Sequence, residues 1–393
     1  MIDVTAARAD TPGCEERLHL NNAGASLMPR PVIDAVIGHL ELEARIGGYE
    51  AADEARDRIE EIRTSAARLV NCTPPEIALF ENATRAWDAI FYALPFHPGD
   101  RILTGRAEYC SNYMAYLHIS RSTGAEVVVI DDDERGQLDI DRMRHEIDGR
   151  TRLISLTHVP TSGGLVNPAA DVGRVARDAG VPFLLDACQS VGQMPIDVRQ
   201  VGCDFLATTG RKFLRGPRGT GFLYVRDEWL ERLHPHVVDV RAATWVERDR
   251  YELRPDARRF ETWEVSYALQ LGLGRAIDYA LDLELEAIWR RVRDLAGSLR
   301  AGLSEIPGVR VHDTGAVKCG IVTLTVDGWD AHELRPALGA QGVNVDLSEA
   351  VDTRLDFEAR GLEPMIRASI HYFNTEEEIA RFVGLIAVLA GES

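Results

Sequence analysis

Seven short apolar runs between residues 76 and 225 constrain the fold of this chain more than any other feature. Segments of helical length separate most of these runs, which span residues 76–80, 100–104, 125–131, 151–159, 181–187, 203–209 and 219–225. Strands that are apolar on both faces are typical of a parallel sheet covered by helices. The pattern predicts an α/β unit with a mainly parallel seven-stranded sheet, in which ligands bind at the carboxyl ends of strands.

The remaining chain predicts a smaller α+β unit. A long helical pattern, broken once or twice, follows residue 265, and the strand-like runs GVRVHD, CGIVTLTV and GVNVDL come after it. The last helix is predicted to begin with a capping box formed by Thr375 and Glu378. We expect residues 1–35 to pack with the small domain, residues 36–265 to form the large α/β domain, and residues 266–393 to form the small α+β domain.

The amino-acid composition limits which classes of partner this chain is expected to bind. The 393 residues include 44 basic and 62 acidic ones, and the net charge of -18 disfavours nucleic acid as a partner. No run approaches the roughly 18 apolar residues of a membrane span, and the start MIDVTAARAD lacks the regions of a signal peptide. The six cysteines are scattered, with no pair at metal-ligand spacing. We expect a cytoplasmic enzyme that binds no nucleic acid, membrane or metal.

Polar residues follow two of the apolar runs in positions that suit a ligand. Asn82, Ala83 and Thr84 open a helical pattern after run 76–80, and free amides at a helix start could hold an anion such as phosphate. An ordinary helix cap is the alternative. Asp186 ends an otherwise apolar run, where a carboxylate needs a fixed partner, either a ligand or a helix cap or salt bridge. Gln189 could face the same ligand.

Lys212 follows run 203–209 and precedes several glycines. This position suits an amine that is desolvated so that it can act as a nucleophile. A surface lysine in a basic loop is the alternative when the motif is taken alone. A phosphate-binding helix start, a buried carboxylate and a lysine are, however, the three elements that a pyridoxal phosphate site requires. Their order along the chain predicts pyridoxal 5'-phosphate as the cofactor.

The sequence also resembles a known family over nearly its whole length. The resemblance rests on six segments, HLNNAGASLMPRPV, ENATRAWDAI, THVPTSGGLVNP, DACQSVGQMPIDV, TTGRKFLRGPRGTGFLYV and IRASIHYFNTEEEIARF. They are similar to the class V, cysteine-desulfurase-like branch of the fold-type I pyridoxal phosphate enzymes. The resemblance implies the fold-type I transferase fold, with a large α/β domain and a smaller α+β domain, and a homodimer with shared active sites.

The resemblance implies a role for each residue of the cofactor site. Lys212 would be the catalytic residue that forms the Schiff base and carries the proton, and Asp186 would pair with the ring nitrogen. Gln189 would lie near the phenolic oxygen, and Tyr109 would stack on the ring. Thr161 occupies a place where relatives often have asparagine. The phosphate would be held by the Ala83 amide, Thr84, Thr209 and Arg211.

Four residues are predicted to contact the substrate. Arg367 matches the arginine that clamps the substrate carboxylate, and Asn22 belongs to the first similar segment. Tyr49 lies in ARIGGYEAA, which is similar to a segment in lyases of the ergothioneine pathway, and could border the substrate. Trp263 lies in RRFETWE. Relatives have at this place a stretch that contacts the phosphate bound in the neighbouring subunit. Trp263 could line the entrance of the active site instead.

One departure from the family decides the predicted reaction. Cysteine desulfurases carry a catalytic cysteine between a strand like GVNVDL and the IRAS motif, but here the stretch SEAVDTRLDFEARGLEP contains none. We therefore predict a carbon-sulfur β-lyase that acts on an S-substituted cysteine or cysteine sulfoxide and releases pyruvate and ammonia. The alternatives are epimerisation, transamination, decarboxylation-coupled deamination, desulfuration without the usual cysteine, or a catalytically inactive binding homologue.

Overall fold

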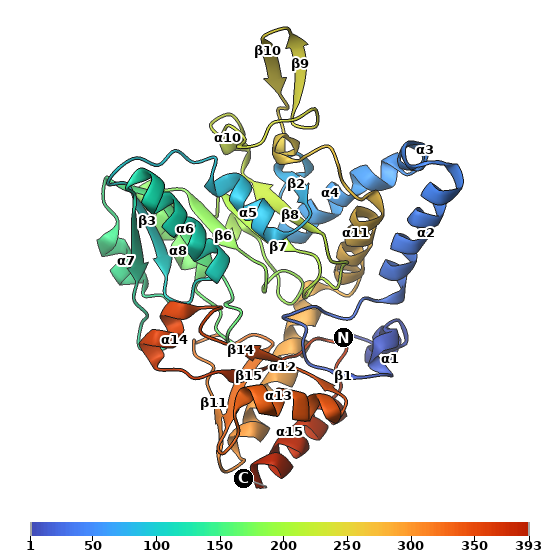
Figure 1. The fold of residues 1–393 in the computed structure, drawn as a ribbon, viewed down its shortest axis with the longest axis vertical. Coiled ribbons are helices and arrows are strands. Elements are labelled where there is room, and N and C mark those ends of the chain that lie inside the picture. The colour runs from blue at the N-terminus through green and yellow to red at the C-terminus, as the bar shows by residue number, and fades with distance from the viewer. Residues whose placement is uncertain (1, 392–393) are drawn as a thin grey trace.

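A seven-stranded sheet forms the centre of the larger part of the molecule in the computed structural model, which describes residues 2–391 (Figure 1). Its order is β2-β8-β7-β6-β5-β3-β4, and only β8 runs antiparallel to its neighbours. The prediction of a mainly parallel seven-stranded sheet is confirmed. The strands are β2 (Ile77–Phe80), β3 (Arg101–Gly105), β4 (Glu126–Ile130), β5 (Thr151–Thr157), β6 (Phe183–Asp186), β7 (Phe205–Thr209) and β8 (Gly221–Val225).

Helices cover both faces of this sheet, which explains why its strands are almost wholly apolar. Successive strand residues point to opposite faces, so Leu184 joins one buried cluster and Leu185 the other. The Leu185 cluster includes side chains of α4 (Arg56–Val70), α8 (Ala169–Ala179) and α11 (Tyr267–Asp282). The Leu184 cluster includes those of α5 (Ala83–Phe91) and α6 (Cys110–Thr123). Other helices of this part are α2 (Arg30–Ile46), α3 (Gly48–Glu54), α7 (Ile140–Glu146), α9 (Val198–Val201) and α10 (Asp227–Leu230).

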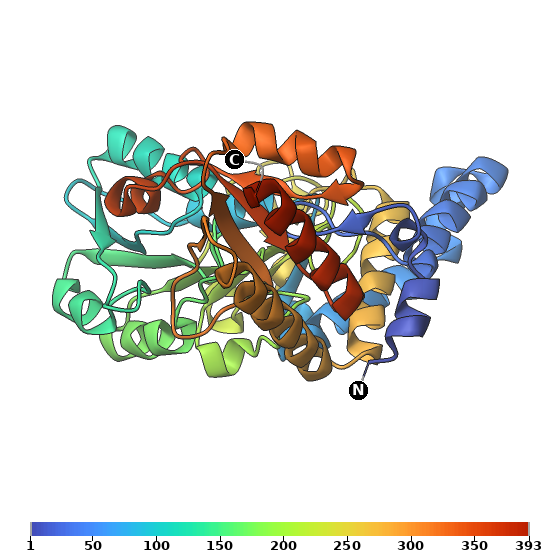
Figure 2. The ribbon, with the colours of Figure 1, turned by 90° about the horizontal axis from the view of Figure 1, so that it is seen from below.

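A four-stranded antiparallel sheet organises the C-terminal part. Its order is β11 (Val309–Val311), β12 (Ile321–Val326), β15 (Met365–Ser369), β14 (Asp346–Ser348). Helices α12 (Leu285–Ser304) and α15 (Glu376–Gly391) lie side by side against it (Figure 2). The capping box at α15 is confirmed, because the Thr375 amide donates to Glu378 Oε2 and the Glu378 amide to Thr375 Oγ1, both at 3.2 Å. The remaining helices are α13 (Ala331–Ala340) and α14 (Arg354–Arg360).

The N-terminal residues contact the C-terminal part. After α1 (Val4–Ala9), strand β1 (Leu18–His19) pairs in parallel with β13 (Val343–Asn344). The prediction of one strand over GVNVDL is wrong: its first half pairs with β1 and its second half, β14, pairs with β15. The long helical pattern breaks once, where Glu284 between α11 and α12 takes a φ of 63°.

The predicted division at residues 35 and 265 stays a prediction. Helix α11 begins after residue 265, yet its Leu271, Leu273 and Ile277 lie in the core of the large sheet. Residue 1 and residues 392–393 of the predicted end units lie outside the described residues. A hairpin of β9 (Ala243–Glu247) and β10 (Arg250–Leu253) projects from the top of the large part (Figure 1). Three short 3-10 helices span Pro12–Cys14, Pro74–Glu76 and Ala257–Phe260. Across residues 2–391, we find no helix of the length and apolarity that crossing a membrane requires.

Candidate active site

A cavity opens where the parallel strands β5, β6 and β7 end and helix α5 begins. It holds about 630 Å³ of space not filled by atoms, including its open mouth, which is within the usual range for small-molecule sites. All nine residues that were predicted to bind the cofactor line it. The full lining is Asn82, Ala83, Thr84, Tyr109, Asn112, Thr157, Val159, Thr161, Asp186, Cys188, Gln189, Thr209, Arg211 and Lys212.

Lys212 lies inside this cavity and is not a surface residue of a basic loop. Its side chain is buried, and burial lowers the pKa of its amine to about 8. The loop that carries it folds back tightly, because the Gly216 amide donates to Gly210 O at 2.8 Å and the Arg215 amide to Lys212 O at 2.9 Å. The Arg215 guanidinium, itself buried, donates to Tyr372 and to Thr11. The amine is therefore held in a site where its neutral form is accessible near neutral pH.

Asp186 ends β6 as a buried carboxylate with two fixed hydrogen bonds. Its Oδ1 accepts from the Cys188 amide at 3.0 Å and its Oδ2 from Asn112 Nδ2 at 2.9 Å. Within residues 2–391 it forms no ion pair, which excludes the salt bridge considered from the sequence. Asp186 lines the cavity, where a cation of a ligand would complete the contacts of its carboxylate.

The start of α5 and the end of β7 form an anion-binding end of the cavity. Asn82 caps α5 by accepting from the Arg85 amide at 2.9 Å, and the amides of Ala83 and Thr84 belong to the first turn, which has no intrahelical acceptors. Thr209 is buried at the end of β7. The Arg211 guanidinium adds a positive charge, and its Nη1 donates to Gly24 O. Amides, a hydroxyl and a guanidinium together suit a phosphate group.

Arg367 does not line the cavity but contacts Thr161, which does. Its Nη1 donates to Thr161 Oγ1 at 2.7 Å and its Nη2 lies 3.4 Å from Asp346 Oδ2. Gln189 Nε2 also donates to Thr161 Oγ1, at 3.1 Å. Arg367 Nε and Gln189 Oε1 are buried and have no hydrogen-bond partner among the described residues. Such atoms are costly unless a ligand satisfies them, so the site is built for polar groups that the chain itself does not supply.

Comparison with known proteins places the chain in a family. A family model, aminotransferase class V, matches residues 18–382. The chain belongs to the class V aminotransferases. A probable cysteine desulfurase of Methanothermobacter thermautotrophicus is 30% identical over 98% of this chain and 97% of its own length. The apo structure of a cysteine desulfurase from Thermococcus onnurineus NA1 superposes with a TM-score of 0.94, at 26% identity and over 100% and 99% of the two chains. A structure of the cystine C-S lyase C-DES with its product cysteine persulfide matches with a TM-score of 0.87, at 24% identity and over 96% and 99%, which shows the same fold.

Class V aminotransferases are pyridoxal-phosphate-dependent enzymes, and the residues of this cavity fit that cofactor. The anion-binding end suits its phosphate, Asp186 suits a protonated ring nitrogen, and the unpartnered Gln189 Oε1 lies among the groups that would face the ring. The buried amine of Lys212 suits the Schiff base. The chain is therefore a cysteine-desulfurase-like enzyme of this family with pyridoxal phosphate as its cofactor, and nothing in the comparisons singles out the ergothioneine-pathway lyases.

None of the four residues predicted to contact the substrate lines the cavity, although Arg367 contacts Thr161, which does. Asn22 is fully buried and donates to Ser369 O at 2.7 Å, so it joins the N-terminal segment to β15. Tyr49 is 73% exposed on α3 and Trp263 is 48% exposed. Folding of one chain does not bring these two aromatic side chains to the site, and their roles stay predictions that require a second subunit.

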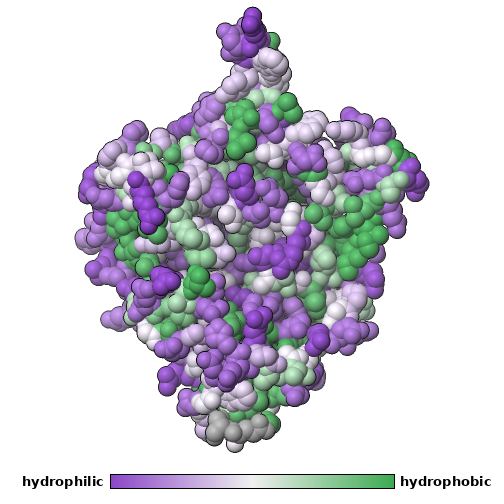
Figure 3. Space-filling view, viewed as in Figure 1, coloured by the Kyte–Doolittle hydropathy of each residue, from purple (hydrophilic) through white to green (hydrophobic). Residues whose placement is uncertain are grey.

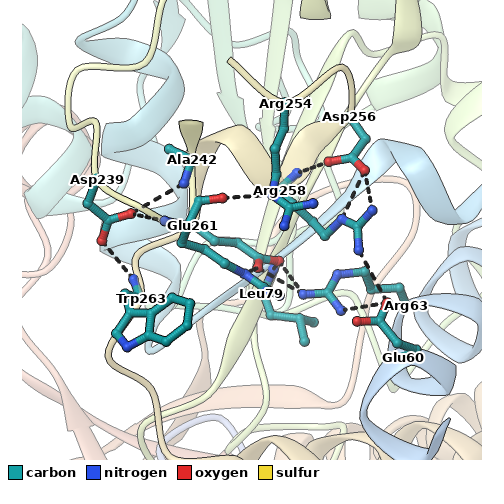
Figure 4. A network of polar contacts seen from close by, with 11 residues as sticks. Glu60, Arg63, Leu79, Asp239, Ala242, Arg254, Asp256, Arg258, Glu261 and Trp263 are labelled. Atoms are coloured by element: carbon teal, nitrogen blue, oxygen red, sulfur yellow. Dashed lines mark hydrogen bonds and ion pairs between the residues drawn. The ribbon is translucent and has the colours of Figure 1, made fainter. Parts of the chain in front are cut away.

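The segment that carries Trp263 is nevertheless held firmly. Glu261 is buried and accepts from Arg63 Nη2 at 2.7 Å, from Arg241 Nε at 2.9 Å and from the Leu79 amide at 2.9 Å (Figure 4). Asp239 accepts from the Trp263 amide at 2.7 Å. These bonds connect the segment to β2, the strand that precedes helix α5.

Sequence reasoning missed two polar residues of the cavity, Asn112 and Thr157. Both follow elements that were identified, since Thr157 ends β5 and Asn112 lies three residues after Tyr109 in the segment AEYCSN. The signal that would have found Asn112 is helical spacing: residues three apart share one face of a helix. It lies on the first turn of α6, whose N-cap is Tyr109.

Proposed function

We propose that this enzyme is a carbon-sulfur β-lyase which acts on an S-substituted cysteine or cysteine sulfoxide and releases pyruvate and ammonia. The observation that carries the proposal is the stretch 348–364, between β14 and β15, where cysteine desulfurases carry their catalytic thiol. In this chain it has no cysteine, and helix α14 occupies its middle. A reaction in which the leaving sulfur departs directly from the substrate needs no enzyme thiol.

The cysteines near the cavity do not replace the missing thiol. Cys188 lines the cavity, but burial raises the pKa of its thiol well above the ordinary value, and the charge of Asp186 raises it further. Burial also raises the pKa of Cys110, at the start of α6. Because the thiolate is the form that attacks sulfur, neither residue is suited to accept a sulfur atom from the substrate near neutral pH.

The chain's own residues suit a β-elimination. When bound, the cofactor withdraws electrons from the α carbon of the substrate amino acid. Arg367 would hold the substrate carboxylate through a guanidinium that is buried and only partly engaged by Asp346. The Lys212 amine, with a pKa of about 8, would take the α proton. As that proton leaves, the bond between the β carbon and sulfur breaks, and the released aminoacrylate hydrolyses to pyruvate and ammonia.

Cysteine desulfuration without the usual thiol is the second candidate. The relatives that carry the name probable cysteine desulfurase favour it, since one is 30% identical over almost the entire chain. The two candidates differ in the products that they release. Desulfuration yields alanine and a transferred sulfur atom, whereas β-elimination yields pyruvate, ammonia and a free thiol or sulfenate.

The test offers the purified holoenzyme a panel of S-alkyl cysteines, their sulfoxides, cystine and free cysteine. We expect pyruvate and ammonia in equal amounts from at least one S-substituted compound, and no product with Lys212→Ala. A Cys188→Ser variant is the matched control, and we expect it to keep pyruvate release within about twofold. Alanine formation from free cysteine, abolished in Cys188→Ser, would select desulfuration. A D-amino acid, carbon dioxide or a keto acid with an intact side chain would select epimerisation, decarboxylation or transamination.

A further inference from the structure

A second buried carboxylate lies behind Asp186. Glu108 sits between β3 and α6, is 4% exposed and forms no ion pair within residues 2–391. Burying a carboxylate without a cation is costly unless hydrogen bonds replace its water. Five groups supply them: Thr104 Oγ1 at 2.7 Å, Tyr116 OH at 3.3 Å, the Tyr109 amide at 2.8 Å, Asn112 Nδ2 at 2.9 Å, and Thr157 Oγ1.

Three of these five donors belong to residues that line the cavity, namely Tyr109, Asn112 and Thr157. Glu108 itself does not line it. The Glu108 carboxylate therefore holds three residues that line the cavity, although Glu108 lies outside the lining. Its Oε1 accepts from the Tyr109 amide and from the Asn112 side chain, and because both are N–H donors, this oxygen is an acceptor whether or not Oε2 carries a proton.

Asn112 connects the two carboxylates through a single nitrogen. Its Nδ2 carries two hydrogens and lies 2.9 Å from Glu108 Oε1 and 2.9 Å from Asp186 Oδ2. Two carboxylate acceptors fix which way the amide points, since its carbonyl oxygen would be repelled there. The torsion of an aspartate carboxylate is otherwise broad. With Oδ1 held by the Cys188 amide, the bond from Asn112 sets the remaining rotation of Asp186.

We propose that Asn112 and Glu108 are positioning residues that hold the Asp186 carboxylate in the orientation at which it meets the ring nitrogen of the cofactor. The inference rests on the proposed role of Asp186 and does not depend on which substrate bond breaks. Asn112 lines the cavity and Glu108 does not, and the role assigned to both acts through Asp186.

The test compares two cofactors in the full-length, cofactor-free enzyme. One is pyridoxal phosphate and the other is its analogue with carbon in place of the ring nitrogen, and the dissociation constant of each is measured by quenching of protein fluorescence. Asp186 interacts with the ring nitrogen only in the first. We expect Asn112→Ala to reduce the preference for pyridoxal phosphate over the analogue by about tenfold, the lower end of the effect of removing an outer hydrogen-bond partner at other sites. Glu108→Met, which removes the acceptor Oε1, should reduce it in the same direction.

Asn167→Ala is the matched control. Asn167 is also buried and donates from Nδ2, to Thr157 O at 2.9 Å, but it contacts neither carboxylate. We expect this variant to raise the dissociation constants of pyridoxal phosphate and of the analogue by the same factor. The preference for pyridoxal phosphate should therefore not change. Asp186→Ala serves as the reference, because it should remove the preference altogether.

The outcomes separate the inference from the assignment on which it rests. If Asp186→Ala removes the preference while Asn112→Ala and Glu108→Met leave it intact, the positioning role is overturned and the role of Asp186 stands. If Asp186→Ala leaves the preference intact, both the positioning role and the proposed role of Asp186 are overturned. If Asn112→Ala yields no folded protein, Glu108→Met carries the same comparison, and an unchanged preference in that variant overturns the inference.

Discussion

The buried amine of Lys212 has an energetic consequence for the protein without cofactor. Its pKa is about 8 in the folded chain, because burial disfavours the ammonium, and about 10.4 in an unfolded chain. Between these values the unfolded chain binds more protons, so the free energy of unfolding rises with pH in that window. Below pH 8 the folded protein bears the full cost of a buried charge, roughly 3 kcal/mol at 1.36 kcal/mol per pKa unit.

Lys212→Met is expected to stabilise the cofactor-free protein, because methionine fills a similar space without a charge. The gain over the natural chain should be largest at pH 7 and shrink as the pH rises from 8 to about 10.4. Urea unfolding of both proteins at several pH values measures this gain in the free energy of unfolding. A difference in unfolding free energy that stays constant over this range would contradict the buried, shifted amine.

At the level of single residues, sequence reasoning found the groups whose chemistry is unusual for their position. A lysine and an aspartate at the ends of apolar strands are conspicuous, and both lie in the cavity. Asn112 was missed because an amide on a helix is ordinary, and its position between two carboxylates depends on how α6 packs against β5 and β6. Tyr49 and Trp263 were chosen by similarity, and one folded chain leaves both outside the cavity.

At the level of elements, the loop that carries Lys212 is held against the turn that follows β6. Gly192 in that turn has a φ of 96°, and a Cβ added there would lie 2.5 Å from Leu214 N and from Phe213 O, the backbone just after Lys212. No real Cβ approaches backbone atoms so closely, so the loop or the turn must move. Glycine is therefore required at this position both for its conformation and for the close approach.

Gly192→Ala is expected to lower the stability of the protein by more than about 2 kcal/mol and to reduce the fraction of chains that bind cofactor. Gly180→Ala is the matched control: Gly180 has a φ of 65° but open space around an added Cβ, so it bears only the backbone cost of about 1 to 2 kcal/mol. Urea unfolding and visible absorbance per chain measure the two effects. Equal losses of bound cofactor in the two variants would contradict the role of the close approach.

The elements themselves were predictable to different degrees. Six of the seven strands of the large sheet are mostly buried and the edge strand β4 is partly buried, so their apolar runs are visible without knowledge of the fold. The split between β13 and β14 is not visible, because it depends on which distant strand pairs with each half. The hairpin of β9 and β10 was not predicted, since most of its residues are exposed and carry no pattern of burial.

At the level of the whole molecule, two exposed features are typical of a surface that a second copy of the chain would cover. Figure 3 shows an apolar area over helix α2, and Ile37 and Leu40 of this helix are 49% and 50% exposed. Trp263 stands half exposed on a segment that ion pairs hold in place (Figure 4). Large exposed apolar groups on a fixed surface are typical of an interface. We expect sedimentation to give the mass of a homodimer.

A shared active site makes a sharper prediction than the mass. Trp263 does not line the cavity of its own chain, so we expect it to serve the cavity of the partner subunit. Trp263→Ala should then reduce kcat/KM by about tenfold, in the range of losses caused by truncating an interfacial aromatic residue, and Lys212→Ala should abolish activity.

Mixed dimers decide between the two placements of Trp263. A dimer of one Lys212→Ala chain and one Trp263→Ala chain contains one site with both defects and one site with neither, provided that the tryptophan serves the partner. Such dimers, obtained by co-expression with two different affinity tags, should recover about half the activity of the natural dimer. If Trp263 serves its own chain, each site carries one defect, and the mixed dimer should not exceed half the activity of the Trp263→Ala homodimer. Because each subunit supplies one defect only, recovery cannot arise from either homodimer and reports the exchange of Trp263 between subunits directly.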